Sequence, residues 1–188
     1  MKRYKIDPEV VQRVCREVVD LPLEDDVMFQ AIRDKLSEQY PDLISPHERC
    51  WIGSRAGGIL GKMTLLYAGL NEYLIIFGTP AGTQGFSGRY HFMQIWDFFL
   101  AGETLTCDLE SGQIIPQIHK PGDTGFLDKG HSLTCEMKAG SWMIEYGRGA
   151  IITAFPFALM DSLMSSLDFK SVFVTIKEYT HFFLKSFR

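Results

Sequence analysis

The amino-acid sequence predicts an α+β protein that is mainly β, with helices at both ends of a β-rich middle region. Apolar residues recur at helical spacing in the N-terminal part and again after residue 150. Between these parts, short apolar runs are separated by turn residues about every 8–12 positions, which is typical of a β-sandwich or a β-barrel. We therefore expect a β unit flanked by helices.

The length and composition of the chain fit one globular domain over residues 1–188. We expect a helical N-terminal part at 1–45, a β-barrel at 50–150 and C-terminal helices at 151–188. The net charge of −4 argues against an electrostatic nucleic-acid binder. Aromatic residues make up 13% of the chain, which suits a lined apolar cavity or a lipid-facing surface.

The first expected helix begins at Asp7-Pro8-Glu9. Asp7 can cap the helix, the proline suits its first turn, and the glutamate complements the helix dipole. Leu21-Pro22-Leu23 ends this helix, and a second helix is expected from Glu24 to Gln39, just before Tyr40-Pro41. The apolar positions of the first helix follow helical spacing: Val10, Val11, Val14, Cys15, Val18 and Val19.

Three glycines, Gly57, Gly58 and Gly61, mark the change to β-like sequence. They permit a close backbone approach or a bulge. They do not form a phosphate loop, because no Gly-Lys-Ser/Thr follows them. A glycine-rich loop is expected from Gly78 to Gly88. The expected strands lie at 63–67, 72–77, 92–100, 104–109, 114–118, 132–137 and 142–146.

Two helices are expected near the C-terminus. The segment from Thr153 to Leu163 is apolar nearly all round, and Asp168 can cap a last helix that carries an apolar stripe. Either these helices pack as core over an open end of the β unit, or they lie in a membrane interface with lysines along their edges. The stripe includes Phe169, Phe173, Ile176, Tyr179 and Phe183, and the lysines are Lys170, Lys177 and Lys185.

No metal or cofactor is expected. The four cysteines are far apart in the sequence, as are the five histidines, so no metal-ligand spacing is present. No window holds the 18 or more apolar residues of a spanning helix, and the N-terminus has no apolar signal core. We therefore expect no transmembrane helix or signal peptide in this chain. Any association with a membrane would be peripheral.

Glu145 stands out because it interrupts the apolar stretch "GSWMIEYGRGAI". A carboxylate in such a setting points to water, finds a partner or carries function. As a strand residue, Glu145 could face solvent and pair with Arg148. It could instead face the interior and serve as a functional group.

Several ordered motifs resemble the family of the sigma-1 receptor and the fungal C-8 sterol isomerase. They are "AGGILGKMTLLYAGLNEYLIIFGTPAGTQGFSGRY", "GSWMIEYGRGAI" and "PFALMDSLMSSLDF", with a weaker match in "IDPEVVQRVCREVV". The resemblance implies a cupin-like β-barrel without a metal, closed by two C-terminal amphipathic helices that rest against a membrane. It also implies a homotrimer and, in a eukaryote, a location at the endoplasmic reticulum membrane.

The resemblance also assigns residues to a site. Glu145 matches the central acid of the family's barrel, and Asp97 in "QIWDFFLAG" matches its second acid. Other positions fall where the family lines its pocket: Met63, Tyr73, Ile75, Phe77, Met137, Ile151, Phe155 and Tyr179. Ile59 and Met137 stand where the receptor has tryptophans, which predicts a different pocket shape.

Two functions from different classes follow from this resemblance. The first is a sterol C-8 isomerase that shifts a double bond of a sterol-like lipid by acid/base proton transfer, with Glu145 and Asp97 as catalytic residues. The second is a non-catalytic protein that binds lipids or cationic amphiphiles as the sigma-1 receptor does. A protonated amine mimics the carbocation of the isomerase reaction, so one site suits both.

Overall fold

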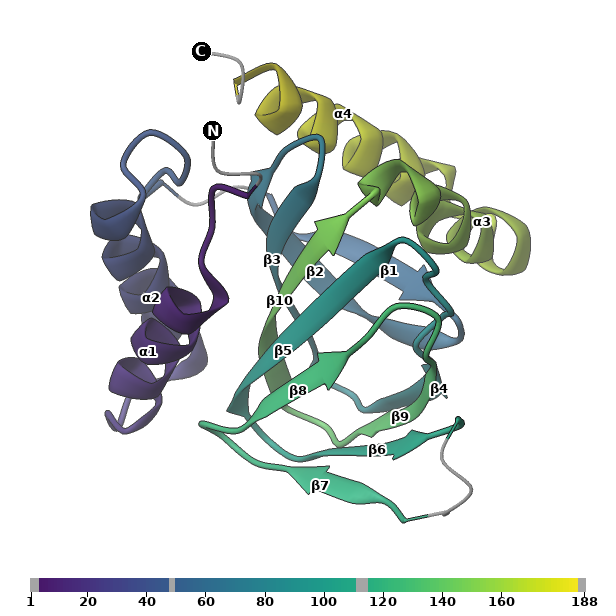
Figure 1. Ribbon diagram of the computed structural model, residues 1–188, viewed down its shortest axis with the longest axis horizontal. Coiled ribbons are helices and arrows are strands. Elements are labelled where there is room, and N and C mark those ends of the chain that lie inside the picture. The colour runs from purple at the N-terminus through teal and green to yellow at the C-terminus, as the bar shows by residue number, and fades with distance from the viewer. Residues whose placement is uncertain (1–3, 48–49, 111–114, 186–188) are drawn as a thin grey trace.

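The fold described here comes from a computed structural model, which describes residues 4–47, 50–110 and 115–185. Two antiparallel sheets make up its centre (Figure 1). The six-stranded sheet has the order β1-β2-β3-β10-β5-β8, and the four-stranded sheet has the order β4-β9-β6-β7. The α+β, mainly β class predicted from the sequence is confirmed, although the two ladders do not close into one continuous barrel within the described residues.

The strands of the six-stranded sheet are β1 (Ile52–Ala56), β2 (Ile59–Ala68), β3 (Glu72–Thr79), β5 (Met93–Ala101), β8 (Thr124–Leu127) and β10 (Ser141–Gly149). Those of the four-stranded sheet are β4 (Thr83–Phe86), β6 (Thr104–Asp108), β7 (Gln117–His119) and β9 (Leu133–Met137). The helices are α1 (Pro8–Val19), α2 (Asp25–Gln39), α3 (Phe155–Ser166) and α4 (Phe169–Lys185), and a 3₁₀ turn at Ile151–Thr153 precedes α3.

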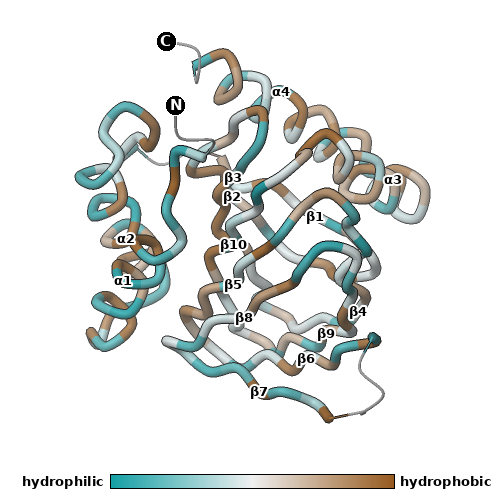
Figure 2. The backbone as a smooth tube through the Cα atoms, in the orientation of Figure 1, coloured by the Kyte–Doolittle hydropathy of each residue, from teal (hydrophilic) through white to brown (hydrophobic). Residues whose placement is uncertain are grey.

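The N-terminal helices form as predicted and cover one face of the six-stranded sheet (Figure 1). The Asp7 carboxylate caps α1 by accepting a hydrogen bond from the Glu9 amide at 3.0 Å. Val11, Ile32 and other apolar residues of α1 and α2 pack against β3, β5 and β10 in the main core cluster. Figure 2 shows hydrophobic residues running along β3 and β10, next to this layer. The opposite face of the sheet is left free to line a cavity.

The glycine cluster makes a tight turn and two close backbone approaches. Gly57 and Gly58 connect β1 to β2 with φ angles of 60° and 84°, which other residues rarely adopt. A Cβ on Gly57 would lie 2.0 Å from the Phe86 carbonyl oxygen, and one on Gly61 would lie 2.3 Å from the Gly78 carbonyl oxygen. The predicted close backbone approach is therefore confirmed, and it occurs within the chain.

Three strands depart from the sequence prediction. The expected glycine-rich loop from Gly78 to Gly88 contains β4, while β1 and β8 lie in regions where no strand was expected. All three are short and contain a glycine, which weakens the alternating pattern used to find strands. The strand expected at 114–118 overlaps β7, which begins later, at Gln117. Residue 114 lies outside the described residues.

The C-terminal helices pack on the β unit, as one of the two expected arrangements requires, and also expose an apolar surface, as the other requires. On one side of α4, Val174, Tyr179 and Phe182 pack against a cluster that includes Ile52 and Leu65 of the six-stranded sheet. On its other side, Phe169 and Phe173 are 64% and 69% exposed. The two helices thus close the end of the β unit while leaving an apolar surface open. None of the helices in the described part of the chain has both the length and the apolarity needed to cross a membrane.

Candidate functional site

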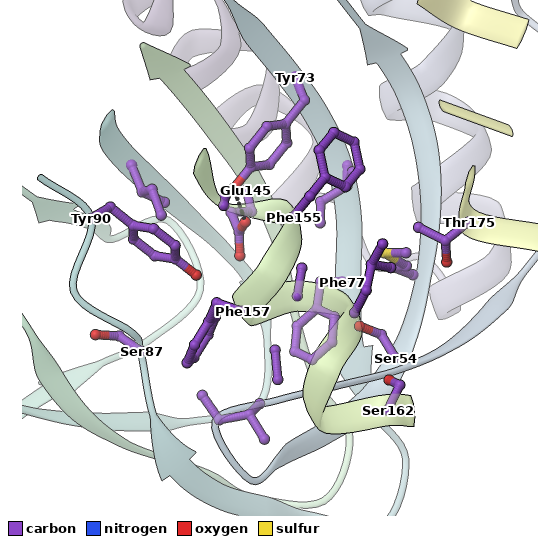
Figure 3. A pocket seen from close by; sticks show the side chains of 18 of the residues that line it. Ser54, Tyr73, Phe77, Ser87, Tyr90, Glu145, Phe155, Phe157, Ser162 and Thr175 are labelled. Carbon is purple, nitrogen blue, oxygen red and sulfur yellow. Dashed lines mark hydrogen bonds between the residues drawn. The ribbon is translucent and has the colours of Figure 1, made fainter. Parts of the chain in front are cut away.

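A cavity of about 200 Å³ lies between the two sheets and beneath α3 and α4 (Figure 3). All ten residues that the resemblance assigns to a site line this cavity. They are Met63, Tyr73, Ile75, Phe77, Asp97, Met137, Glu145, Ile151, Phe155 and Tyr179. They come from β2, β3, β5, β9, β10, the 3₁₀ turn, α3 and α4. Residues far apart in the sequence therefore meet around one predominantly apolar space.

Glu145 and Asp97 face each other across two neighbouring strands. Residue 145 of β10 pairs directly with residue 97 of β5 in the antiparallel register. Directly opposed residues on one sheet face have Cβ atoms about 4.5–5.5 Å apart, so their carboxyl groups interact strongly. Along β10 the side chains alternate between faces, which directs Met143 and Glu145 to the cavity and Tyr146 to the core beneath α1 and α2.

Tyr73 contacts this pair from β3, the strand that borders β10 on the side away from β5. Its hydroxyl donates a hydrogen bond of 2.5 Å to Oε1 of Glu145 (Figure 3). Tyr73 pairs in register with Gly147, where an added Cβ would lie 2.3 Å from the tyrosine ring. The missing side chain at Gly147 therefore makes room for the ring that reaches Glu145. This requirement explains the first of the two glycines in the motif "EYGRG".

Arg148 does not neutralise either acid. Its side chain bonds to Oε1 of Gln94 at 3.2 Å and stacks over the Trp96 ring at 4.4 Å. It lies three residues from Glu145 and therefore on the other face of β10. In the described residues, no lysine or arginine forms an ion pair with Glu145 or Asp97. The solvent-facing pair of Glu145 and Arg148 considered from the sequence is absent.

Burial and mutual repulsion favour protonation of the acid pair. Burial raises the pKa of Asp97 well above its ordinary value, and the charge of Glu145 raises it further. Burial also raises the pKa of Glu145, but the hydrogen bond from Tyr73 acts in the opposite direction. One oxygen of Asp97, Oδ1, is buried and has no hydrogen-bond partner among the residues that the structure describes. The pKa values of both acids are therefore raised, and the Tyr73 hydrogen bond favours the charged form of Glu145.

Some lining residues were not identified from the sequence. Tyr90 directs its hydroxyl into the cavity (Figure 3), and burial together with the charges of Glu145 and Asp97 raises its pKa. The Phe157 ring packs edge-on against Tyr90 at 5.6 Å. Both residues belong to the quoted motifs, at the end of "SGRY" and the start of "PFALMD", so the motifs could have identified them. The apolar periodicity could not have identified Tyr90, because this residue lies outside regular secondary structure.

The site offers oxygen atoms but no metal-binding cluster. Across the described residues, no group of three or more histidine, cysteine, aspartate or glutamate side chains is arranged to hold a metal ion. Cys135 lines the cavity, but burial raises the pKa of its thiol to about 12, and the nearby acids contribute to this shift. Its thiolate is therefore scarce at neutral pH. The chemistry available is proton transfer and the binding of positive charge.

Among solved structures, the fold is similar to an RmlC-like cupin from Shewanella frigidimarina. The two share 16% sequence identity with a TM-score of 0.43, over 53% of this chain and 83% of that one.

Sequence comparisons cover nearly all of the chain. A Gallus gallus protein named sigma non-opioid intracellular receptor 1 is 37% identical over 180 residues, which are 95% of this chain and 79% of that protein. A Dictyostelium discoideum protein named protein erg2 homolog is 36% identical over 172 residues, 89% of this chain and 70% of that protein. The family model described as "ERG2 and Sigma1 receptor like protein" matches residues 1–187. The chain therefore belongs to the ERG2 and sigma-1 receptor family.

Proposed function

We propose that this protein is a sterol C-8 isomerase-like enzyme that moves a double bond of a sterol-like lipid bound in the cavity. The observation that carries this proposal is the facing pair of Asp97 and Glu145, which lies in an apolar cavity without a cationic partner among the described residues. An apolar lining suits a ring system that offers little besides hydrophobic surface. The family resemblance supplies the reaction class.

The proposed reaction consists of two proton transfers. Asp97 donates its proton to C9 of the C8–C9 double bond, which leaves a tertiary carbocation at C8. The carboxylate of Glu145 then removes a proton from C7, and the electrons of that C–H bond form the C7–C8 double bond. Glu145 finally returns a proton to Asp97, with which it is paired in register. No proton is gained or lost overall.

The surroundings of each carboxyl group fit these roles. A general acid must hold its proton near neutral pH, and burial with a neighbouring negative charge provides this for Asp97. A base must be ionised, and the hydrogen bond from Tyr73 favours the charged form of Glu145. The same negative charge stabilises the carbocation in a site of low dielectric constant.

The test is incubation of the purified protein with zymosterol, followed by gas chromatography and mass spectrometry to separate the double-bond isomers. We expect a C7–C8 product, and we expect Asp97→Asn and Glu145→Gln each to reduce its rate by about 100-fold or more. Glu136→Gln is the matched control, because Glu136 is exposed on β9. Tight binding of zymosterol without any product would contradict the isomerase proposal.

The second candidate is a non-catalytic protein that binds cationic amphiphiles. The ionised carboxylate of Glu145, held by Tyr73 inside an apolar cavity, can pair with a protonated amine whose arms contact the lining. The similarity to proteins named as receptors favours this candidate. Amine binding without zymosterol turnover would select it.

We also propose a peripheral position on a membrane and a homotrimeric assembly. The exposed aromatic side chains of α4 support the first, since an amphipathic surface with flanking lysines binds an interface. The family resemblance supports the second. Light scattering in mild detergent is expected to give three times the chain mass of 21.4 kDa. A mass of one chain at micromolar concentration would rule out the trimer.

A further inference from the structure

The cavity has a second polar region, remote from the acid pair. Ser54, Ser162 and Thr175 line it, and Figure 3 shows all three well separated from Glu145, with the Phe77 ring lying between in this view. They come from β1, α3 and α4. Most of the other residues that line the cavity are apolar.

The hydroxyl of Ser162, and that of Ser171, which also lines the cavity, are already engaged within the protein. The hydroxyl of Ser162 donates to the Arg55 carbonyl at 3.0 Å and accepts from the Arg55 amide at 3.2 Å. The hydroxyl of Ser171 interacts with the carboxylate of Asp168, the residue that caps α4. These two groups fasten α3 and α4 to the protein and have little capacity left for a ligand.

The hydroxyls of Ser54 and Thr175 are different. Neither has a hydrogen-bond partner among the described residues, and both side chains are only partly buried where they line the cavity. The hydroxyl of Thr180, also on α4, is not free, because it donates a hydrogen bond to the Ile176 carbonyl of its own helix at 2.7 Å. A hydroxyl that faces an apolar cavity without such a bond is free to serve a ligand.

Ser54 and Thr175 line the cavity from two elements that contact each other, β1 and α4. Ser54 pairs in register with Gly61, so no side chain on β2 covers it. On α4, Thr175 follows Ser171 by one turn and shares its face. A Cβ on Gly53 would lie 3.3 Å from the Ser171 hydroxyl, which shows that this face of α4 lies against β1.

We propose that Ser54 and Thr175 form a hydroxyl-binding subsite for a neutral polar group at the far end of an otherwise apolar ligand. Both side chains can donate and accept hydrogen bonds, and neither can form an ion pair, so they select a hydroxyl or carbonyl over a charged group. Together with the acid pair, this subsite orients a ligand along the cavity. In a sterol the matching group is the ring-A hydroxyl, an assignment that rests on the proposed function.

The experiment compares ligands with and without the hydroxyl. One pair is zymosterol and its 3-deoxy analogue. The other is a series of N,N-dimethylalkylamines of graded chain length, each with and without a terminal hydroxyl. Affinities are measured by calorimetry for the wild type, for the double variant Ser54→Ala with Thr175→Val, and for Thr180→Val. The last is a matched threonine-to-valine control whose hydroxyl bonds within its own helix.

The wild type and Thr180→Val are expected to bind the hydroxylated ligand about fivefold more tightly than its partner, the effect of one net hydrogen bond. The double variant is expected to lose this preference while keeping its affinity for the ligands without the hydroxyl. That retained affinity also shows that it folds. Thr175→Ser in the presence of Ser54 keeps the hydroxyl and is expected to keep the preference.

The two ligand pairs separate the failure of this subsite from that of the proposed function. If amines show the hydroxyl preference but neither sterol binds, the subsite stands and the isomerase proposal is wrong. If both pairs bind and the preference is absent, or survives in the double variant, the subsite is overturned while the isomerase proposal stands. Failure of all the ligands to bind the wild type would overturn both.

Discussion

Glu145 owes its properties to three neighbours that reach it from different directions. Asp97 lies opposite it on β5, Tyr73 donates a hydrogen bond to it from β3, and Gly147 leaves room for the Tyr73 ring. Within the described part of the chain, Asp97 lacks such a donor, and its Oδ1 has no partner. A single phenol hydroxyl thus makes two similar carboxyl groups unequal, which is the condition for one to act as acid and the other as base.

At the residue scale, Glu145→Gln is expected to weaken binding of a cationic amphiphile by more than about tenfold, or about 1.4 kcal/mol. The reason is that the neutral amide cannot balance a protonated amine in an apolar cavity. Isothermal calorimetry measures the change, and Glu136→Gln on β9 serves as the control. Unchanged affinity in Glu145→Gln would show that the amine is held elsewhere.

The assignment of single residues to the site came from the family motifs. The resemblance, and not the strand periodicity, assigned Asp97, Glu145 and the eight other residues that the structure places around the cavity. Strand alternation alone left Glu145 free to face either side of β10. The pairing of residues 97 and 145 depends on the register of two strands that are far apart in the sequence, β5 (Met93–Ala101) and β10 (Ser141–Gly149), and local patterns do not determine that register. The free hydroxyls of Ser54 and Thr175 likewise emerge only from the packing of α4 against β1.

At the scale of elements, β10 lies between the core beneath the N-terminal helices and the cavity. One face packs beneath α1 and α2, while the other lines the cavity. The two N-terminal helices and the longer strands were predicted because their apolar patterns extend over many residues. The missed strands β1, β4 and β8 have four or five residues each and depend on pairing with neighbours.

The N-terminal segment is held to β3 by a buried carboxylate. Glu72 is 3% exposed and accepts hydrogen bonds from the amides of Lys5 at 2.8 Å and Ile6 at 3.2 Å. The hydroxyl of Tyr146 lies 3.0 Å from its Oε2. Glu72 therefore links the segment before α1 to the sheet.

Glu72→Ala is expected to lower the free energy of unfolding by about 2–4 kcal/mol, because it leaves these buried donors unsatisfied. Urea denaturation followed by circular dichroism measures the change. Glu17→Ala removes an exposed carboxylate of α1 and is expected to have little effect. Equal stability of Glu72→Ala and the wild type would show that the link contributes nothing.

At the scale of the whole molecule, the apolar surface of α4 lies at the opposite end from the β6–β7 hairpin (Figure 1). A surface that exposes Phe169 and Phe173 with Lys170 and Lys177 nearby is suited to a lipid interface. The protein is therefore expected to co-sediment reversibly with vesicles of phosphatidylcholine and phosphatidylserine. Phe169→Glu with Phe173→Glu should reduce the bound fraction, because charged groups resist burial among lipids.

Ile118→Glu is the control for this experiment, since Ile118 is 56% exposed on β7 at the far end of the molecule. It should leave the bound fraction unchanged. Retained amine binding shows that each variant is folded. A wild-type protein that stays in the supernatant with both neutral and anionic vesicles would argue that the exposed aromatic residues serve another purpose.

The central claim is that Asp97 and Glu145 hold one proton between them near neutral pH. Infrared spectroscopy tests it directly, because the C=O stretch of a protonated carboxylic acid is distinct from the bands of a carboxylate. We predict an acid band in the wild type that persists near pH 7, well above the ordinary carboxyl pKa of about 4. In Asp97→Asn any remaining acid band should disappear at lower pH, since the competing negative charge is gone. An acid band that is already lost near pH 5 in the wild type would contradict the claim.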